Sequence, residues 1–179
     1  MGFNNSDRQL PSQPSAKNLK FEREDWTHFR TVEGLQQKAG VAASKLRRLV
    51  LKELADNALD TGAEVDIGQL SSGGYFVEDD GPGIDGSPEE IARLFSINRP
   101  MISTKLLRLP KRGALGNGLR VVAGAVLAPE GRLVVITRNR RIELRPEREG
   151  ATTVVSVEPI DFPVGTRGPT TRTSTARLP

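Results

Sequence analysis

Four side chains that could hold a cation or move a proton lie close together in one stretch of the sequence. Residues 51–64, "LKELADNALDTGAE", contain Glu53, Asp56, Asn57 and Asp60. In an α-helix, spacings of three, four and seven residues bring side chains onto one face. Three carboxylates and an amide on one face have two interpretations. They form either a solvated surface with ordinary ion pairs or a site for a metal ion or an activated water molecule.

The helical wheel separates these four side chains. Asp56 lies four residues after Lys52, so an ordinary ion pair accounts for it. Glu53 and Asn57 fall on the apolar side of the helix, together with Leu46. Burying a carboxylate and an amide there would cost on the order of several kcal/mol unless a metal, water or partner chain satisfied them. We therefore predict a functional role for Glu53 and Asn57.

An acidic residue at the end of an expected strand is followed by a glycine-bearing turn. In "VEDDGPGI", residues 77–84, Asp79 is followed by Gly81 and Gly83. Two glycines let the backbone come close to a flat ligand, and a carboxylate at a strand end can accept a hydrogen bond from an amino group. The pattern suits recognition of a base such as adenine, although Asp-Gly turns are also common in ordinary loops.

A second glycine-bearing segment precedes an expected helix. "KRGALGNGLRVVAGA", residues 111–125, places Gly113, Gly116 and Gly118 before or at the helix start. Free backbone N–H groups and the helix dipole favour the binding of phosphate at such a position. Glycine loops before helices are frequent, so this segment gains its meaning only in combination with the other two.

Charge is distributed unevenly along the chain, whose net charge is +4. Residues 53–90 contain eleven acids and no Lys or Arg, whereas residues 96–129 contain six bases and no acid. One cleft with a cation-holding wall and an anion-holding wall would suit a magnesium nucleotide. The alternative is two solvated faces of opposite charge.

The composition excludes several kinds of site. The chain has no cysteine and a single histidine, His28, so thiolate and multi-histidine metal centres are excluded and a Ser-His-Asp site has little basis. No apolar run approaches the ~20 residues of a membrane span, and the N-terminus lacks the apolar core of a secretory signal. We therefore expect a cytoplasmic, soluble protein that does not enter a membrane.

Hydrophobic periodicity predicts an α+β protein. The expected helices cover residues 41–60, 87–95 and 117–128, and the expected strands cover residues 63–70, 74–79, 132–138, 140–146 and 152–160. Residues 1–20 are rich in Ser, Asn, Gln and Pro and are predicted to form a disordered arm. Residues 167–179 contain almost no apolar side chain and are predicted to form a basic tail that supplies no core strand.

Taken in order, three segments resemble the N, G1 and G2 boxes of the GHKL ATPases: "ELADNALDTGAE", "VEDDGPGI" and "RGALGNGL". The resemblance covers about residues 45–127 and is nearest to the branch of MutL, topoisomerase VI and MORC proteins. It implies the Bergerat fold, a two-layer α/β sandwich with helices on one face of a mixed, mostly antiparallel sheet. Residues 21–166 would form this ATP-binding domain.

The resemblance also implies roles for the first two boxes. Asn57 would coordinate Mg²⁺, and Glu53, one turn earlier, would position or deprotonate the attacking water as a general base. Asp79 would bind the amino group of adenine. Gly81 and Gly83 would make room for the base.

For the phosphates, the resemblance implies a glycine loop and a lid. The β- and γ-phosphates would be held by Gly113, Gly116 and Gly118 with the amides of Leu115, Asn117 and Leu119. An ATP lid would extend over about residues 96–116, with Lys105 or Lys111 contacting phosphate. A distal threonine at the adenine end is expected as Thr166 in "VGTR", with Thr152 or Thr153 as the alternatives.

Three functions remain open after this comparison. The first is a Mg²⁺-dependent ATPase that works as a conformational switch, with an ATP-dependent homodimer or partner subunit, and with DNA as a partner by analogy with its branch. The second is a phosphotransfer or signalling module of the histidine-kinase or anti-sigma type, for which His28 is the only histidine acceptor. The third is an ATP sensor without turnover.

Overall fold

The computed structural model describes residues 25–99 and 117–168. The predicted arm, most of the predicted lid and most of the predicted tail lie outside these residues. The described helices are η1 (Asp25–Arg30), α1 (Val32–Ala39), η2 (Ala43–Lys45), α2 (Leu46–Leu59), α3 (Pro88–Leu94) and α4 (Gly118–Leu127). The described strands are β1 (Val65–Gln69), β2 (Tyr75–Asp79), β3 (Leu133–Thr137), β4 (Arg140–Pro146), β5 (Thr152–Pro159) and β6 (Thr166–Gly168).

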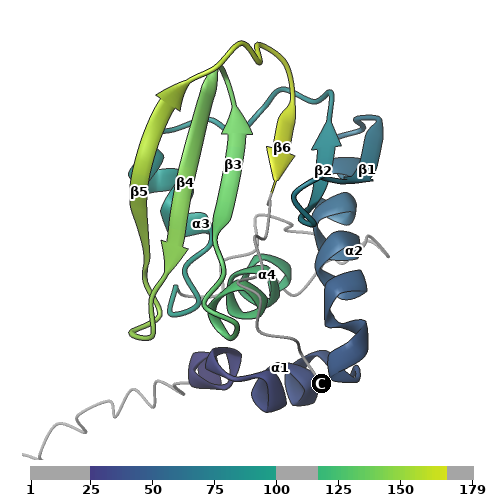
Figure 1. Cartoon of the computed structure of the whole chain (residues 1–179), viewed down its shortest axis with the longest axis vertical. Helices are drawn as coiled ribbons and strands as arrows, with labels where there is room; N and C mark the ends of the chain where they lie inside the picture. Colours follow the sequence, from purple (N-terminus) through teal and green to yellow (C-terminus); the bar gives the residue numbers. More distant parts are fainter. Residues whose placement is uncertain (1–24, 100–116, 169–179) are drawn as a thin grey trace, which may run out of the picture.

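The strands form one sheet in the order β1-β2-β6-β3-β4-β5, and all five pairings are antiparallel. Helix α2 packs along β1 and β2, while α3 packs against β5 at the opposite edge of the sheet (Figure 1). Helix α4 lies between them and contacts α2 and β4. The predicted α+β fold, a two-layer sandwich with helices on one face of the sheet, is confirmed.

The core lies between the helices and one face of the sheet. Alternate residues of β3 and β4 point into it, namely Leu133 and Val135, and Ile142 and Leu144, and all four are fully buried. This alternation is the period of two that a half-buried strand requires. The helical layer contributes Leu46, Val50, Ile91, Val122 and Val126 to the same cluster.

Local sequence accounts for the start of α3. The Ser87 side chain accepts a hydrogen bond from the N–H of Glu90 at 3.2 Å, and the Glu90 carboxylate accepts one from the N–H of Ser87 at 2.7 Å. This reciprocal pair is a capping box, and Pro88 occupies the first helical position. The predicted helix start at Ser87 is therefore confirmed.

Helix α4 contains a glycine because its neighbour comes very close. A methyl group at Gly124 would overlap the backbone carbonyl of Phe29 in η1 and lie 2.9 Å from Cδ2 of Leu35. The glycine weakens helix propensity by about 1 kcal/mol but allows this close packing.

Among residues 25–99 and 117–168, no helix is long and apolar enough to cross a membrane.

Strand β6 differs from the sequence prediction. Residues 167–179 were expected to supply no core strand, but Arg167 and Gly168 continue from Thr166 as a strand in the interior of the sheet, between β2 and β3. Arg167 and Gly168 therefore belong to the domain and not to the predicted tail. Three residues suffice because both neighbouring strands provide hydrogen-bonding partners and the flanking strands already form the core.

Candidate functional site

The acidic face of α2 is arranged differently from the helical-wheel prediction. Asp56 is buried and pairs with Lys52, whose Nζ lies 2.6 Å from Oδ2; this hydrogen bond raises the pKa of Lys52. Asn57 is exposed, so its predicted position over the apolar core is wrong. Val50, seven residues earlier on the same face, is buried, so the described residues cover this face at Val50 but not at Asn57.

Glu53 lies against the beginning of α4. Its side chain is half-buried, at 19% exposed. A methyl group at Gly118, the first residue of α4, would lie only 2.6 Å from Oε2 of Glu53. The absence of a side chain at Gly118 thus lets the carboxylate approach the helix N-terminus, where the dipole stabilises negative charge.

The N-terminus of α4 has no side-chain cap. Asn117 occupies the cap position without making a side-chain hydrogen bond to the helix, and its buried Oδ1 has no hydrogen-bond partner among residues 25–99 and 117–168. The next residue but one, Leu119, is partly buried and packs against the core. Uncapped N–H groups at a helix start can bind an oxyanion. Five other residues considered as phosphate contacts, Lys105, Lys111, Gly113, Leu115 and Gly116, lie outside the described residues.

Asp79 ends β2 with a partly buried carboxylate. Its Oδ1 accepts a hydrogen bond from the N–H of Gly81 at 2.9 Å. Burial raises the pKa of the Asp79 carboxyl above its ordinary value, while backbone N–H groups offset part of that rise. The charges of Asp80 and Glu78 raise this pKa further.

Glycines leave space around this carboxylate. A methyl group at Gly81 would lie 2.9 Å from Oδ1 of Asp79, and one at Gly165 would overlap its backbone carbonyl. Gly83 has a φ of +77°, in the left-handed region that favours glycine. Local packing therefore favours glycine at both predicted positions, at Gly81 because of the nearby carboxylate and at Gly83 because of its backbone conformation.

Thr166 is placed beside Asp79, directly across the β2–β6 pairing. Thr152 and Thr153 lie on β5, at the far edge of the sheet from β2. The hydroxyl of Thr152 donates a hydrogen bond to the carbonyl of Phe95 at 3.0 Å. Of the three threonines considered from the sequence, Thr166 is the one that the fold brings to Asp79.

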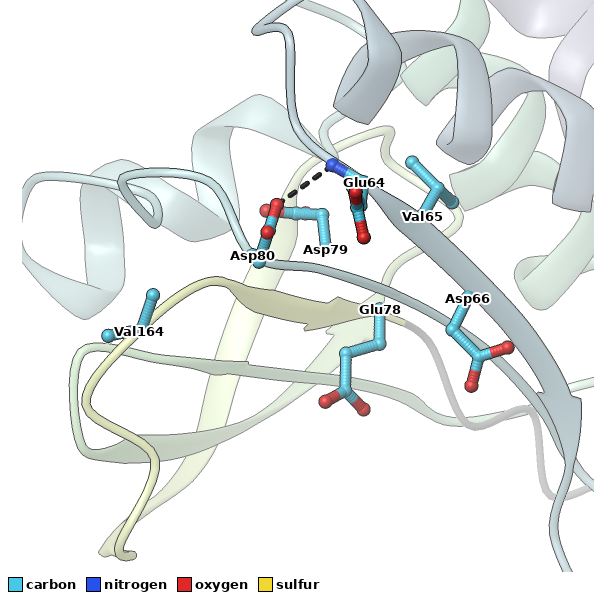
Figure 2. A pocket seen from close by; sticks show the side chains of 7 residues that line it. All are labelled: Glu64, Val65, Asp66, Glu78, Asp79, Asp80 and Val164. Carbon is cyan, nitrogen blue, oxygen red and sulfur yellow. Dashed lines mark hydrogen bonds between the residues drawn. The ribbon is translucent and has the colours of Figure 1, made fainter.

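A pocket of about 310 Å³ opens beside Asp79 at the edge formed by β1 and β2 (Figure 2). Five of its seven lining residues are acidic. The carboxylate of Asp80, just after β2, accepts a hydrogen bond at 2.8 Å from the N–H of Glu64, just before β1. The lining residues are Glu64, Val65, Asp66, Glu78, Asp79, Asp80 and Val164. Such a surface repels phosphate, so a nucleotide's phosphates would have to lie toward α4 instead.

Two further residues bear on the predicted roles. Arg120, in α4, is buried and donates a hydrogen bond to the carbonyl of Arg99, so it joins the described residues on either side of segment 100–116. His28 is exposed on η1. Within residues 25–99 and 117–168, no group of three or more His, Cys, Asp or Glu side chains is arranged to hold a metal ion.

Sequence reasoning missed Thr137 at the end of β3. This side chain is fully buried, and its hydroxyl bonds to both Ile84 and Gly165. The one signal in the sequence was a hydroxyl at the end of the otherwise apolar strand "LVVIT". That signal is weak, because strands often end in threonine.

Solved structures that are similar to this chain include three at low identity. The N-terminal domain of a DNA repair protein matches 69% of the chain at 21% identity and a TM-score of 0.43. The ATPase region of Saccharomyces cerevisiae topoisomerase II matches 69% at 15% identity and a TM-score of 0.42. The 43K ATPase domain of Thermus thermophilus gyrase B, in complex with an aminocoumarin, matches 81% at 21% identity and a TM-score of 0.37.

These likenesses concern the fold alone. The chain spans about a third of the length of each structure, at 34%, 37% and 35%. No family model matches the chain, and no curated protein matches it.

Proposed function

We propose that this chain is a Mg²⁺-dependent ATP-binding domain that hydrolyses ATP slowly and acts as a nucleotide-driven switch. The proposal rests on one observation: the domain contains both a site that suits a nucleotide base and a site that suits phosphates. At one, Asp79 and Thr166 meet beside a glycine turn; at the other, Glu53 meets the uncapped start of α4. The first suits the base of a nucleotide and the second suits its phosphates.

In this proposal the adenine amino group donates a hydrogen bond to the Asp79 carboxylate. The N–H of Gly81 already donates to Oδ1 and so holds that carboxylate in place. Guanine carries a carbonyl oxygen where adenine carries its amino group, and that oxygen would repel the carboxylate. The site should therefore prefer ATP to GTP.

At the phosphate end, backbone N–H groups at the start of α4 would bind phosphate oxygens. The exposed amide of Asn57 would contribute one oxygen to Mg²⁺, and the nucleotide's phosphates and water would supply the rest, since Mg²⁺ commonly keeps several non-protein ligands. The ion would supply charge neutralisation of the phosphates. Glu53, held beside Gly118, would accept a proton from the attacking water.

The wider roles follow from the sequence resemblance. An ATP-dependent homodimer or a partner subunit would complete the switch, and DNA would be a partner by analogy with the same branch. Sedimentation with and without a non-hydrolysable ATP analogue tests the first, and a DNA-binding assay over a range of salt concentrations tests the second.

Calorimetric titration with Mg²⁺ and either ATP or its non-hydrolysable analogue tests the proposed function. We expect Asp79→Asn to abolish binding, because the substituted amide offers a donor toward the adenine amino group. Asp66→Asn is the matched control, since it removes the same charge from the same pocket on the neighbouring strand. Equal binding by wild type and Asp79→Asn would overturn the base site.

Phosphate release on Glu53→Ala tests the hydrolytic step. We expect turnover to fall about a hundredfold or more while analogue binding remains within a few-fold of wild type, as for loss of a general base. Glu64→Gln, which changes an exposed carboxylate in the acidic pocket, should leave turnover unchanged. Binding without any turnover in the wild type would instead establish an ATP sensor.

A further inference from the structure

Thr137 connects two segments that flank the proposed base site. Its side chain is 0% exposed. The hydroxyl accepts a hydrogen bond from the N–H of Ile84 at 2.9 Å and donates one to the carbonyl of Gly165 at 3.2 Å. Ile84 belongs to the turn that follows Asp79, and Gly165 immediately precedes Thr166. One hydroxyl therefore joins the two parts of the chain that hold the proposed base-binding side chains.

The turn and the start of β6 also touch each other directly. The N–H of Gly165 donates to the carbonyl of Gly81 at 3.0 Å. A methyl group at Gly83 would lie 2.9 Å from Oγ1 of Thr137 and 3.1 Å from the carbonyl oxygen of Gly165. The turn is thus packed against the hydroxyl with no room for a side chain between them.

The Asp79 carboxylate depends on both segments. Its Oδ1 receives a hydrogen bond from the N–H of Gly81, in the turn, and Thr166, in β6, lies directly opposite Asp79 in the β2–β6 pairing. A shift of the turn relative to β6 would move the Gly81 donor and rotate the carboxylate relative to Thr166. The separation of the two segments therefore sets the direction in which Asp79 points.

We propose that Thr137 is a positioning residue for base recognition, whose hydroxyl fixes the turn 81–84 against β6 so that Asp79 and Thr166 face the same edge of the base. The inference deepens the proposed function and rests on it. Thr137 does not itself contact the base. It acts through the two segments that it joins.

The chemistry of β3 supports this role over simple filling of the core. The other core-facing residues of the strand, Leu133 and Val135, are apolar and fully buried. Valine has nearly the shape of threonine, so packing alone would be served by valine at position 137. Valine would, however, leave the N–H of Ile84 and one lone pair of the Gly165 carbonyl without their present partner.

The test compares Thr137→Val with Thr137→Ser by calorimetric titration of MgATP and MgGTP. We expect Thr137→Val to weaken ATP binding about ten- to a hundredfold, the factor that corresponds to the free-energy cost of leaving a buried hydrogen-bonding group without its partner. We also expect it to lower the ratio of ATP affinity to GTP affinity. Thr137→Ser keeps the hydroxyl and should bind ATP within about threefold of wild type. Val135→Ala is the control for stability alone: it should lower the melting temperature without changing the affinity ratio.

Amide hydrogen exchange supplies a measurement that needs no nucleotide. The Ile84 amide should exchange faster in Thr137→Val and as slowly as wild type in Thr137→Ser. If Ile84 exchanges faster but the ratio of ATP to GTP affinity stays at the wild-type value, the inference is wrong while the proposed function stands. If the wild type binds no ATP, the proposed function fails, and the role of Thr137 in base recognition fails with it.

Discussion

At the scale of single residues, the Asp79 carboxylate is unfavourably buried and yet held in a fixed position. Burial raises its pKa, so the charged form is less favourable in the folded chain than in the unfolded chain. The N–H of Gly81 nevertheless holds it in place. A side chain that carries an electrostatic cost and yet is fixed in position fits a binding role better than a stabilising one.

The raised pKa gives a stability prediction with a definite sign. Because the folded protein binds the Asp79 proton more tightly than the unfolded chain, this carboxyl destabilises the fold above its folded pKa, and that cost disappears below the unfolded value. We expect Asp79→Asn to melt at a higher temperature than wild type at pH 7. The difference should shrink as the pH falls through the pKa window of this carboxyl.

Thermal melts followed by circular dichroism at a series of pH values measure this difference. Asp66→Asn serves as the control, because Asp66 is exposed and its substitution removes one charge from the same region without relieving any burial. A lower melting temperature for Asp79→Asn at pH 7 would mean that the carboxylate contributes more through its hydrogen bonds than it costs through burial.

At the scale of secondary structure elements, α4 presents two glycines to two different neighbours. Gly118 faces the flexible end of the Glu53 side chain, whereas Gly124 faces the rigid backbone of Phe29. A methyl group at the first position can be accommodated by movement of a carboxylate. At the second position the helix itself must move.

The two alanine substitutions should therefore separate function from stability. We expect Gly118→Ala to keep nearly wild-type stability but to lower phosphate release, since it displaces Glu53 and crowds the helix N-terminus. We expect Gly124→Ala to lower the free energy of unfolding by about 1–3 kcal/mol, despite the better helix propensity of alanine. Denaturant melts and a phosphate-release assay on both variants check this, and the opposite pattern would mean that the packing around α4 has been misinterpreted.

Elements that are stabilised by local interactions could be predicted from the sequence, whereas elements that are stabilised by distant segments could not. The start of α3 was predictable because the capping box at Ser87 and Glu90 is local. Strand β6 was not, because its three residues carry no apolar pattern and are ordered by pairing with β2 and β3. The exposure of Asn57 was missed for a related reason: a helical wheel gives the face of a helix but not the length over which neighbouring elements cover it.

In the candidate site too, local motifs identified residues but not the contacts that distant segments make with them. The residues Glu53, Asp79 and Thr166 were chosen from short motifs, and their roles stay predictions. What the sequence could not provide was their surroundings: the approach of Gly118 to Glu53 and the contacts of Thr137. Both depend on register between elements that are distant in the chain, and no local pattern records that register.

At the scale of the whole molecule, part of the acidic block of the sequence gathers around one pocket. The pocket beside Asp79 is lined by five carboxylates, while the start of α4 offers uncapped N–H groups. A magnesium nucleotide bound across α2 would place its base near the acidic end and its phosphates near α4. Such binding would connect the sheet to both helices, and a ligand that binds only the folded chain stabilises the whole domain.

Magnesium ATP should therefore raise the melting temperature. At a ligand concentration a hundredfold above Kd the stabilisation is about 2.7 kcal/mol, which corresponds to roughly 5–10 °C for a domain of this size. The shift should be much smaller with MgGTP, because guanine presents an acceptor to the Asp79 carboxylate, and smaller with ATP in EDTA, because the phosphates then lack their cation. Asp79→Asn, compared with its own melting temperature without ligand, should show almost no shift. An equal shift with ATP and GTP that persists in Asp79→Asn would mean that the nucleotides bind through their phosphates at basic surface residues, and the base site would have to be abandoned.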